Sequence, residues 1–315
     1  MVKKVDVTNL TQLPGVGDGT AEKLKEGGII TIMGIATSSP GQIKDASGLG
    51  EATSRKIINA ARDLCDLEFE LASEVEKKEK DLQYISTHCE SVDKLLGGGL
   101  QLNSTLEAYG QFASGKTQLG HLLAVATIKK FPKGVVIYID TENTFKTSRI
   151  RDFCKGLDVD PEEALSRIKV GKAISSDHQI LLTENIEKEM VANKEDVKLI
   201  IIDSLMNHFR AEYLGRGSLA NRQQMINSYL HKIAILVANY KMAVYLTNQV
   251  QSDPGAMFGD PTKHIGGNIV GHFATTRVYM RKGIKGSRKI ILIDSPNLPE
   301  GDTNFMITDA GFKDV

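Results

Sequence analysis

The sequence of 315 residues contains no tryptophan, only three cysteines and only eight prolines. The cysteines lie far apart, at Cys65, Cys89 and Cys154, so they exclude a disulfide framework, give no metal-binding spacing and favour a reducing compartment. No apolar run approaches the roughly 18 residues that a membrane-spanning helix needs. The N-terminal segment has no apolar core typical of a signal peptide. We therefore expect a cytoplasmic protein with no membrane partner.

The sequence also has no excess of positive or negative charge, because 39 basic and 39 acidic side chains give a formal net charge of zero. This balance excludes a strongly cationic, histone-like protein. It does not exclude nucleic acid as a partner, since only the local charge of a binding groove matters there. Apolar residues at 41% and charged residues at 25% are typical of a globular protein. The length predicts about two domains.

Two Gly-x-Gly turns occur within the first 65 residues. The turn at residues 15–17 precedes a helical pattern at Thr20–Glu26, and the turn at residues 48–50 precedes one at Thr53–Leu64. A tight glycine turn exposes backbone N–H groups beside a helix N-terminus, where a phosphate group can bind. Residues 1–65 therefore resemble a small all-α domain with a pair of helix-hairpin-helix elements that binds DNA. Ordinary helical turns are the alternative.

The character of the sequence changes after this region. A charged stretch over residues 66–83 predicts a linker or a solvated helix between two domains. Strands are expected at Gly134–Asp140, Lys198–Asp203, Ala243–Val250, Thr275–Arg281 and Lys289–Asp294, and helices at His121–Lys130, Asp177–Asn193 and Leu219–Tyr240. Continuously apolar strands that alternate with helices predict an α/β fold with a buried, mostly parallel sheet over residues 84–315.

The segment Gly110–Thr117, GQFASGKT, fits the phosphate-loop pattern G-x-x-x-x-G-K-[ST]. Its glycines let the backbone wrap a phosphate, and the following helix N-terminus adds positive potential. Lys116 would reach the β- and γ-phosphates of ATP, and the Thr117 hydroxyl would bind Mg²⁺. The residues expected around the nucleotide are Gly110, Gln111, Phe112, Ala113, Ser114, Gly115, Lys116, Thr117 and Gln118.

Two of the expected strands end in acidic residues. Asp203 stands where a P-loop enzyme places the aspartate of its magnesium shell. The alternative is a core strand with a capping aspartate. Ser204 rather than a glutamate follows, so the catalytic base must come from elsewhere. Glu142, after the strand at Gly134–Asp140, is the candidate base that orients the attacking water. The alternative is that Glu142 is only a solvated surface residue at the end of that strand.

With these motifs in place, the sequence resembles the RecA-like recombinases, in particular the archaeal RadA family and its eukaryotic relatives, over essentially the whole chain. The resemblance is carried by residues 86–100, 140–145, 203–205, 209–217, 220–224, 247–250, 259–261, 265–267, 271–272 and 294–301. It implies a RecA-like P-loop ATPase core behind the helical domain. It also implies a DNA-dependent ATPase that forms helical filaments on single-stranded DNA. Such a protein catalyses homologous pairing and strand exchange with double-stranded DNA in repair, at the nucleoid.

The resemblance also implies roles for individual residues. Lys116 and Glu142 would be catalytic, and Gln249 would sense the γ-phosphate and pass its presence to the DNA. Arg149 would stack on adenine, while Asp294 and Pro299 would cap ATP from the neighbouring subunit. DNA would be bound by Arg210, Arg216, Arg222, Gly266 and Gly267. Because Asp294 would repel the γ-phosphate, we expect a cation such as K⁺ to bridge them.

Phe69 and Ala72, in the linker, are similar to the family's Phe-x-x-Ala polymerisation element. Phe69 would enter a pocket on the next subunit, and a head-to-tail contact of this kind produces a filament or a ring. The alternative is a single helix, because Leu64, Leu67 and Leu71 recur at helical spacing.

A basic hairpin is expected at Arg281, Lys282, Lys285, Arg288 and Lys289, either for duplex capture or as a solvated turn. Two other classes of protein stay open as alternatives. One is a ring-shaped, helicase-type ATPase, and the other is a recombinase paralogue that acts as a mediator.

Overall fold

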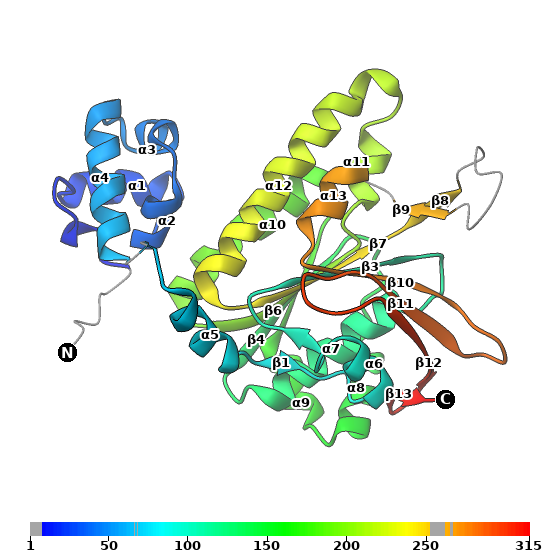
Figure 1. Cartoon of the computed structure of the whole chain (residues 1–315). Coiled ribbons are helices and arrows are strands. Elements are labelled where there is room, and N and C mark those ends of the chain that lie inside the picture. The colour runs from blue at the N-terminus through cyan, green and yellow to red at the C-terminus, as the bar shows by residue number, and fades with distance from the viewer. Residues whose placement is uncertain (1–7, 66, 68, 253–261, 265–266) are drawn as a thin grey trace. The chain divides into compact units, whose positions relative to one another are not determined.

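The computed structural model describes residues 8–65, 67, 69–252, 262–264 and 267–315, excluding the side chains of residues 216, 251, 252, 262–264, 267 and 268 (Figure 1). Two units make up the chain. The first contains residues 1–81 and 187–194, and the second contains residues 82–186 and 195–315. Among the described residues, no helix combines the length and the apolar character needed to cross a bilayer.

The first unit is built from short helices. They are η1 (Leu10–Gln12), α1 (Asp18–Glu26), α2 (Ile32–Thr37), α3 (Pro40–Ser47), α4 (Glu51–Leu64) and α5 (Ala72–Lys80). Gly17 and Gly50 are the N-cap residues of α1 and α4, so each Gly-x-Gly turn leads directly into a helix. Both predicted helical patterns are confirmed. Apolar side chains of these helices, such as Leu24 and Ile57, are fully buried in a small core.

The linker region is not one continuous helix. Helix α4 ends at Leu64 and α5 begins at Ala72, so Phe69 lies between the two helices. The single-helix alternative is therefore wrong. No residue of α5 is buried, as expected for a solvated helix. Phe69 is fully exposed, at 108% of its reference area, which leaves a large apolar ring uncovered in the described chain.

The second unit is organised around a mixed sheet of nine strands in the order β13-β12-β11-β10-β3-β7-β6-β4-β5. The strands are β3 (Thr105–Gly110), β4 (Gly134–Asp140), β5 (Ile168–Lys172), β6 (Asp196–Asp203), β7 (Ala243–Asn248), β10 (Thr276–Lys282), β11 (Arg288–Asp294), β12 (Gly301–Thr308) and β13 (Gly311–Asp314). All neighbours from β10 to β5 pair in parallel, and β10 to β13 pair antiparallel. The predicted mostly parallel sheet is present, and the antiparallel edge is an addition to it.

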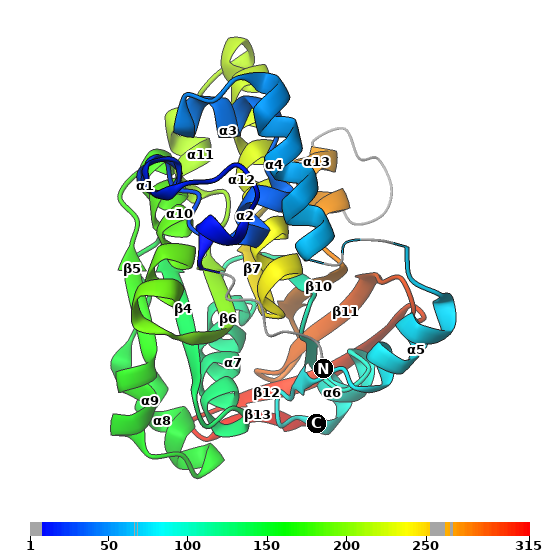
Figure 2. The same ribbon diagram turned by 90° about the vertical axis from the view of Figure 1, so that its left-hand side faces the viewer.

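Helices cover both faces of this sheet. The helices of the second unit are α6 (Glu90–Leu95), α7 (Lys116–Lys130), α8 (Thr147–Leu157), α9 (Pro161–Arg167), α10 (Ser176–Asn193, of which residues 187–193 are assigned to the first unit), α11 (Asn207–Glu212), η2 (Arg216–Ser218), α12 (Leu219–Tyr240) and α13 (Gly267–Phe273). Figures 1 and 2 show α7, α8 and α9 on one face and α12 and α13 on the other. Small pairs of strands complete the unit: β1 (Tyr84–Ile85) with β2 (Leu100–Gln101), and β8 (Val250–Ser252) with β9 (Thr262–His264).

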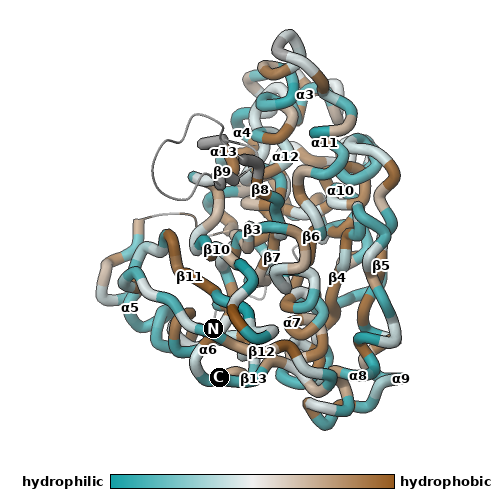
Figure 3. Tube along the Cα trace, turned by 90° about the vertical axis from the view of Figure 1, so that its right-hand side faces the viewer, coloured by the Kyte–Doolittle hydropathy of each residue, from teal (hydrophilic) through white to brown (hydrophobic). Residues whose placement is uncertain are grey.

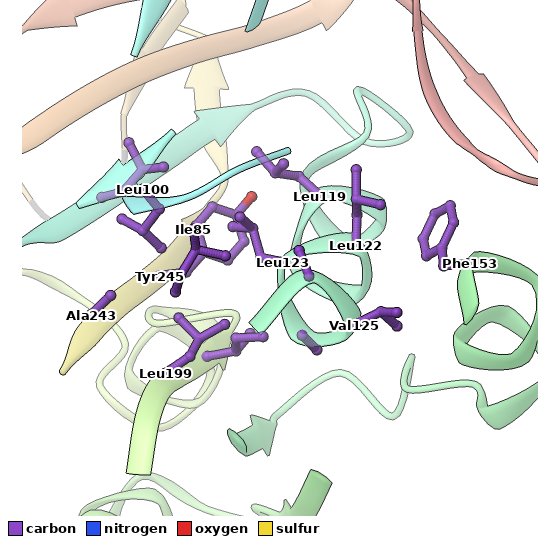
Figure 4. Packing of buried hydrophobic residues seen from close by; sticks show 14 of the residues in the cluster. Ile85, Leu100, Leu119, Leu122, Leu123, Val125, Phe153, Leu199, Ala243 and Tyr245 are labelled. Carbon is purple, nitrogen blue, oxygen red and sulfur yellow. The ribbon is translucent and has the colours of Figure 1, made fainter. Parts of the chain in front are cut away.

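The main core lies between α7 and the sheet. Leu119, Leu122 and Leu123 of α7 pack with Leu199 of β6 and Tyr245 of β7, all fully buried (Figure 4). Every residue of β4 is buried, and the strand is strongly hydrophobic in Figure 3. Burial on both faces explains the continuous apolar runs of the central strands. This packing fixes the carboxyl ends of β3, β4, β6 and β7 at one edge of the sheet.

One predicted strand is divided in two. The run Ala243–Val250 forms β7, which ends at Asn248, and β8, which begins at Val250. Gln249 lies between the two strands. Its backbone N–H donates a hydrogen bond to Oδ1 of Asn248, 2.8 Å away. The break turns Gln249 out of the sheet at its carboxyl edge.

Asp314 of β13 fastens the end of the chain to α6. Its carboxylate accepts hydrogen bonds from the backbone of Ser91 (2.9 Å) and Glu90 (3.1 Å) and from the Cys89 thiol (3.1 Å). Hydrogen bonds from Ser91 and Cys89 lower the pKa of Asp314 to about 2. A folded-state pKa below the unfolded value stabilises the fold above pH ~4, and this contribution is lost as the pH falls towards 2.

We therefore expect Asp314→Asn to lower the thermal unfolding midpoint at pH 7. The difference from the unsubstituted protein should shrink as the pH falls from about 4 to 2, where Asp314 itself becomes neutral. Thermal unfolding followed by circular dichroism at several pH values measures this. Glu300→Gln, at an exposed position, is the control. A difference that is constant across this pH range would contradict the assignment.

Candidate nucleotide site

A cavity of about 680 Å³ opens at the carboxyl edge of the sheet, where β3 leads through the phosphate loop into α7. The loop needs its glycines. An added Cβ at Gly110 would lie 2.0 Å from the Met280 carbonyl oxygen, and Gly115 has a φ of +106°. Ala113 also has a positive φ, +60°, a region that favours glycine. The loop backbone therefore curls around the cavity, and a volume of this size suits a nucleotide-sized ligand.

Lys116 lies at the centre of the loop. Its ammonium donates to the carbonyl oxygens of Gly110 (2.9 Å) and Gln111 (3.0 Å). Burial lowers the pKa of Lys116 below its usual value, and the negative charges of Asp203 and Glu142 offset only part of this decrease. The side chain thus holds a positive charge inside the loop that the sequence predicts to bind phosphate. Its backbone carbonyl is fixed by the Tyr245 hydroxyl, 2.9 Å away.

Asp203, the last residue of β6, is buried and held from two sides. It accepts hydrogen bonds from the hydroxyls of Thr247 and of Tyr138, the latter at 2.9 Å. Burial and the Asp203 charge raise the pKa of Tyr138 well above its usual value, so this tyrosine stays neutral and donates. Asp203 and Thr117 line the same cavity. One carboxylate and one hydroxyl beside a phosphate loop are a donor set that fits Mg²⁺, which keeps several waters and binds substrate phosphates.

Glu142 is positioned by the loop that follows β4. Asp140 accepts the backbone N–H groups of Glu142 (3.2 Å), Thr144 (3.1 Å) and Phe145 (3.0 Å). The loop is therefore folded around the Asp140 carboxylate. Glu142 Oε1 in turn accepts the Ser204 hydroxyl at 2.7 Å. These contacts direct the Glu142 carboxylate into the cavity, where a base that orients water has to lie.

Gln249 connects Glu142 with a neighbouring helix. Its side-chain Nε2 donates to Glu142 Oε1, 2.8 Å away. Its Oε1 accepts from the Arg210 guanidinium of α11, 3.2 Å away. An amide that donates at one end and accepts at the other links both partners. The structure thus connects the predicted base, Glu142, with the predicted DNA-binding residue Arg210 through the predicted sensor, Gln249.

Other predicted site residues do not line the cavity. Asp294 and Pro299 are absent from its lining. Arg149 is also absent, since its guanidinium donates to the Thr308 carbonyl (2.6 Å) and to Gln118 (2.5 Å) and lies 3.9 Å from the Phe153 ring. The stacking role of Arg149 and the roles of Asp294 and Pro299 in a neighbouring subunit stay predictions.

The predicted DNA-binding residues lie on different segments. Arg222 lies near the start of α12 and is half-buried, and Gly267 is the first residue of α13. Gly266 and the side chain of Arg216 lie outside the described residues. Their role in binding DNA therefore stays a prediction.

Several residues of the cavity were given no role at the nucleotide by the sequence, although four of them lie in the segments that carry the family resemblance. They are Thr144, Ser204, Thr247, Val250, Arg288 and Ile307. Arg288 belongs to the basic hairpin, but its Nε donates to the Ala113 carbonyl, 3.0 Å away. Arg288 therefore does not belong to a simple solvated turn, because its side chain contacts the phosphate loop. Its position follows from the antiparallel strands β11 and β12, of which β12 was not predicted.

Comparisons with known proteins place these observations in a family. The family model described as Rad51 matches residues 78–315, and the model described as a SAM-like helix-hairpin-helix tandem matches residues 7–63. Two similar proteins, from Methanocorpusculum labreanum and Methanoculleus marisnigri, are both named "DNA repair and recombination protein RadA". They are 44% and 45% identical to this chain, with 97% of this chain and 98% of each relative covered.

The match extends over both parts of the chain. The predicted fold class is confirmed: an α/β core with a large, mostly parallel sheet preceded by a helical helix-hairpin-helix domain. The resemblance drawn from the motifs is confirmed as well. With the Rad51 model covering residues 78–315 and two relatives matching nearly end to end, this chain belongs to the Rad51 family of RecA-like proteins.

Proposed function

We propose that this protein is a DNA-dependent ATPase that forms helical filaments on single-stranded DNA and exchanges strands with homologous duplex DNA. The observation that carries the proposal is the direct series of contacts from Glu142 through Gln249 to Arg210. It gives a physical route between an ATP site and a DNA-binding surface. The names of the two relatives, which refer to DNA repair and recombination, support the same activity.

ATP would bind in the cavity with Mg²⁺ beside its phosphates. The loop N–H groups and Lys116 would hold the β- and γ-phosphates, and Thr117 and Asp203 would hold the ion and its waters. Bound Mg²⁺ neutralises negative charge on the phosphate oxygens. Glu142 orients the attacking water, and Ser204 keeps its carboxylate in place. Hydrolysis would remove the γ-phosphate contact of Gln249 and so weaken DNA binding.

A neighbouring subunit would complete the nucleotide site. Asp294 and Pro299 would cap ATP from that subunit, with a monovalent cation such as K⁺ between Asp294 and the γ-phosphate. Arg149 would lie against the adenine. A nucleotide held between two subunits would contact both copies. Bound ATP would therefore stabilise the assembly.

DNA would be held by two parts of the chain. In the core, residues 84–315, Arg210, Arg216 and Arg222 would pair with phosphates, and Gly266 and Gly267 would offer backbone N–H groups. This mode leaves base identity free for pairing with a second strand. The helix-hairpin-helix domain, residues 1–65, would add a second DNA contact through the turns before α1 and α4.

The test of this function combines two measurements on the full-length protein. ATP hydrolysis is measured with and without single-stranded DNA, and strand exchange is measured between a single strand and a labelled homologous duplex. Strong stimulation together with strand exchange supports the proposal. Hydrolysis that is indifferent to DNA favours a ring-shaped ATPase. Stimulation without strand exchange favours a mediator paralogue. Either of these outcomes overturns the proposal.

Self-assembly would depend on the linker, residues 66–83. Phe69, fully exposed between α4 and α5, would bury its ring in the next subunit, and Ala72 would fill a smaller pocket beside it. An aromatic anchor of this kind typically contributes enough binding energy that its loss weakens association roughly 30-fold or more. Because the Phe69 ring is fully exposed, a substitution there should not destabilise the fold of its own chain.

We therefore expect Phe69→Glu to abolish assembly without lowering the unfolding temperature. Light scattering coupled to size-exclusion chromatography, with ATP and DNA present, measures the mass of the assembly. Ile284→Glu is the matched control, because Ile284 is also a strongly exposed apolar residue, at 82% of its reference area. An unchanged mass for Phe69→Glu would exclude this segment as the polymerisation element.

A further inference from the structure

A buried ion pair lies in the middle of the sheet, outside the nucleotide cavity. Arg277 of β10 donates from Nε to Oε2 of Glu107 in β3, 2.7 Å away. The two residues are direct partners in the parallel β3–β10 ladder. Glu107 is fully buried and Arg277 is 8% exposed. Neither residue lines the cavity, so the site described above does not use them directly.

Stability alone does not account for this pair. Two charges removed from water lose their hydration, and well-packed apolar side chains of similar volume commonly stabilise a core as well or better. The pair is also incompletely satisfied: within the described residues, Arg277 Nη2 is buried without a hydrogen-bond partner. The guanidinium carbon lies 5.3 Å from the centre of the Tyr109 ring, which offsets only part of that loss. The pair therefore calls for a role beyond packing.

The hydrogen bond made by the second carboxylate oxygen of Glu107 indicates what that role is. Oε1 accepts from Nδ2 of Asn248, the last residue of β7, at 2.8 Å. A side-chain amide has one donor end and one acceptor end, and an ionised carboxylate only accepts. Because Glu107 takes the donor end, the Asn248 oxygen is turned to the backbone N–H of Gln249, 2.8 Å away. This contact directs the Gln249 side chain to Glu142.

We propose that Glu107 and Arg277 are positioning residues that hold Gln249 against Glu142 by fixing the orientation of the Asn248 amide. The inference rests on the proposed function, in which Gln249 links ATP to DNA. Arg277 occupies one carboxylate oxygen and thereby leaves the other for Asn248. Without the pair, the Asn248 amide is free to turn over, and Gln249 loses the anchor at its backbone.

The test removes both charges at once. The double variant Glu107→Leu/Arg277→Met keeps the core filled and leaves no buried charge without its partner. We expect the double variant to fold, to bind ATP with an unchanged Kd, and to show a DNA-stimulated kcat reduced roughly tenfold, a typical size for coupling between residues in contact. The matched control is Lys169→Met/Glu195→Leu, which removes another ion pair (2.7 Å), between Lys169 of β5 and the residue before β6. This control should leave kcat unchanged.

A pair without a positioning role predicts an unchanged kcat for each folded molecule, whatever the change in the unfolding midpoint, and this result would overturn the inference. Crystal structures of both proteins with a non-hydrolysable ATP analogue provide a second readout. The Gln249 Nε2 to Glu142 Oε1 contact should be present in the unsubstituted protein and lost in the double variant. If the unsubstituted protein shows no stimulation by DNA, the proposed function fails. The structures still decide the positioning role, because an undisturbed Gln249 in the double variant overturns it.

Discussion

Substitution of Lys116 by alanine is expected to reduce ATP hydrolysis by at least roughly 10²-fold, the usual loss when one preorganised electrostatic contact to a transition state is removed. The ammonium is held by the carbonyls of Gly110 and Gln111 at the centre of the loop. Among the described residues Lys116 is the one lysine that lines the cavity, and the other cation there, Arg288, is held by the Ala113 carbonyl. Alanine therefore removes a positive charge that no neighbouring lysine replaces. ATP binding should weaken as well, because the same charge would contact the bound phosphates.

A steady-state assay of phosphate release, with and without single-stranded DNA, measures this loss. Lys133→Ala is the matched control, since Lys133 lies in an exposed turn after α7. Lys116→Arg is a second variant that keeps the charge but replaces a compact ammonium by a wider planar group. It is expected to hydrolyse ATP slowly too. Near-normal turnover in Lys116→Ala would exclude this loop as the hydrolytic site, and the proposed function would fail with it.

The phosphate loop was predictable because its chemistry is local. Eight consecutive residues carry the glycines, the lysine and the hydroxyl, so no contact between distant segments is needed to recognise them. The ends of β4 and β6 were predictable for a related reason. A parallel strand buried on both faces is apolar along its length, so an acidic residue where it stops marks the edge where ligands bind.

Contacts between distant segments were not predictable from such patterns. Arg277 and Glu107 are 170 positions apart, and Arg288 and Ala113 are 175 apart. No periodicity connects them, and the strand pairing alone brings them together. β12 was not predicted because it is only partly buried and begins with polar residues, so it forms no continuous apolar run. The contact from Gln249 to both Glu142 and Arg210 likewise depends on the break between β7 and β8, which the prediction of a single strand at Ala243–Val250 did not include.

Substitution of Glu142 by glutamine separates ATP binding from hydrolysis. Glu142 Oε1 accepts from the Ser204 hydroxyl (2.7 Å) and from Gln249 Nε2 (2.8 Å). The amide oxygen of a glutamine can accept both, so the geometry of the site is kept. The amide nitrogen replaces the other carboxylate oxygen, and the residue no longer acts as a base. We expect kcat to fall roughly 10²- to 10⁴-fold, the contribution typical of a positioned general base. The affinity for ATP should stay the same.

The same variant tests whether hydrolysis releases DNA. Because ATP persists in its site, the proposed contact of Gln249 with the γ-phosphate would persist, and the complex with single-stranded DNA should dissociate more slowly than that of the unsubstituted protein. Fluorescence anisotropy of labelled DNA after addition of excess competitor measures the dissociation rate. Glu162→Gln is the control, because Glu162 is an exposed residue that pairs with Arg151 at 2.7 Å. Equal dissociation rates for Glu142→Gln and the unsubstituted protein would show that hydrolysis does not control release, and the switch through Gln249 would then have to be abandoned.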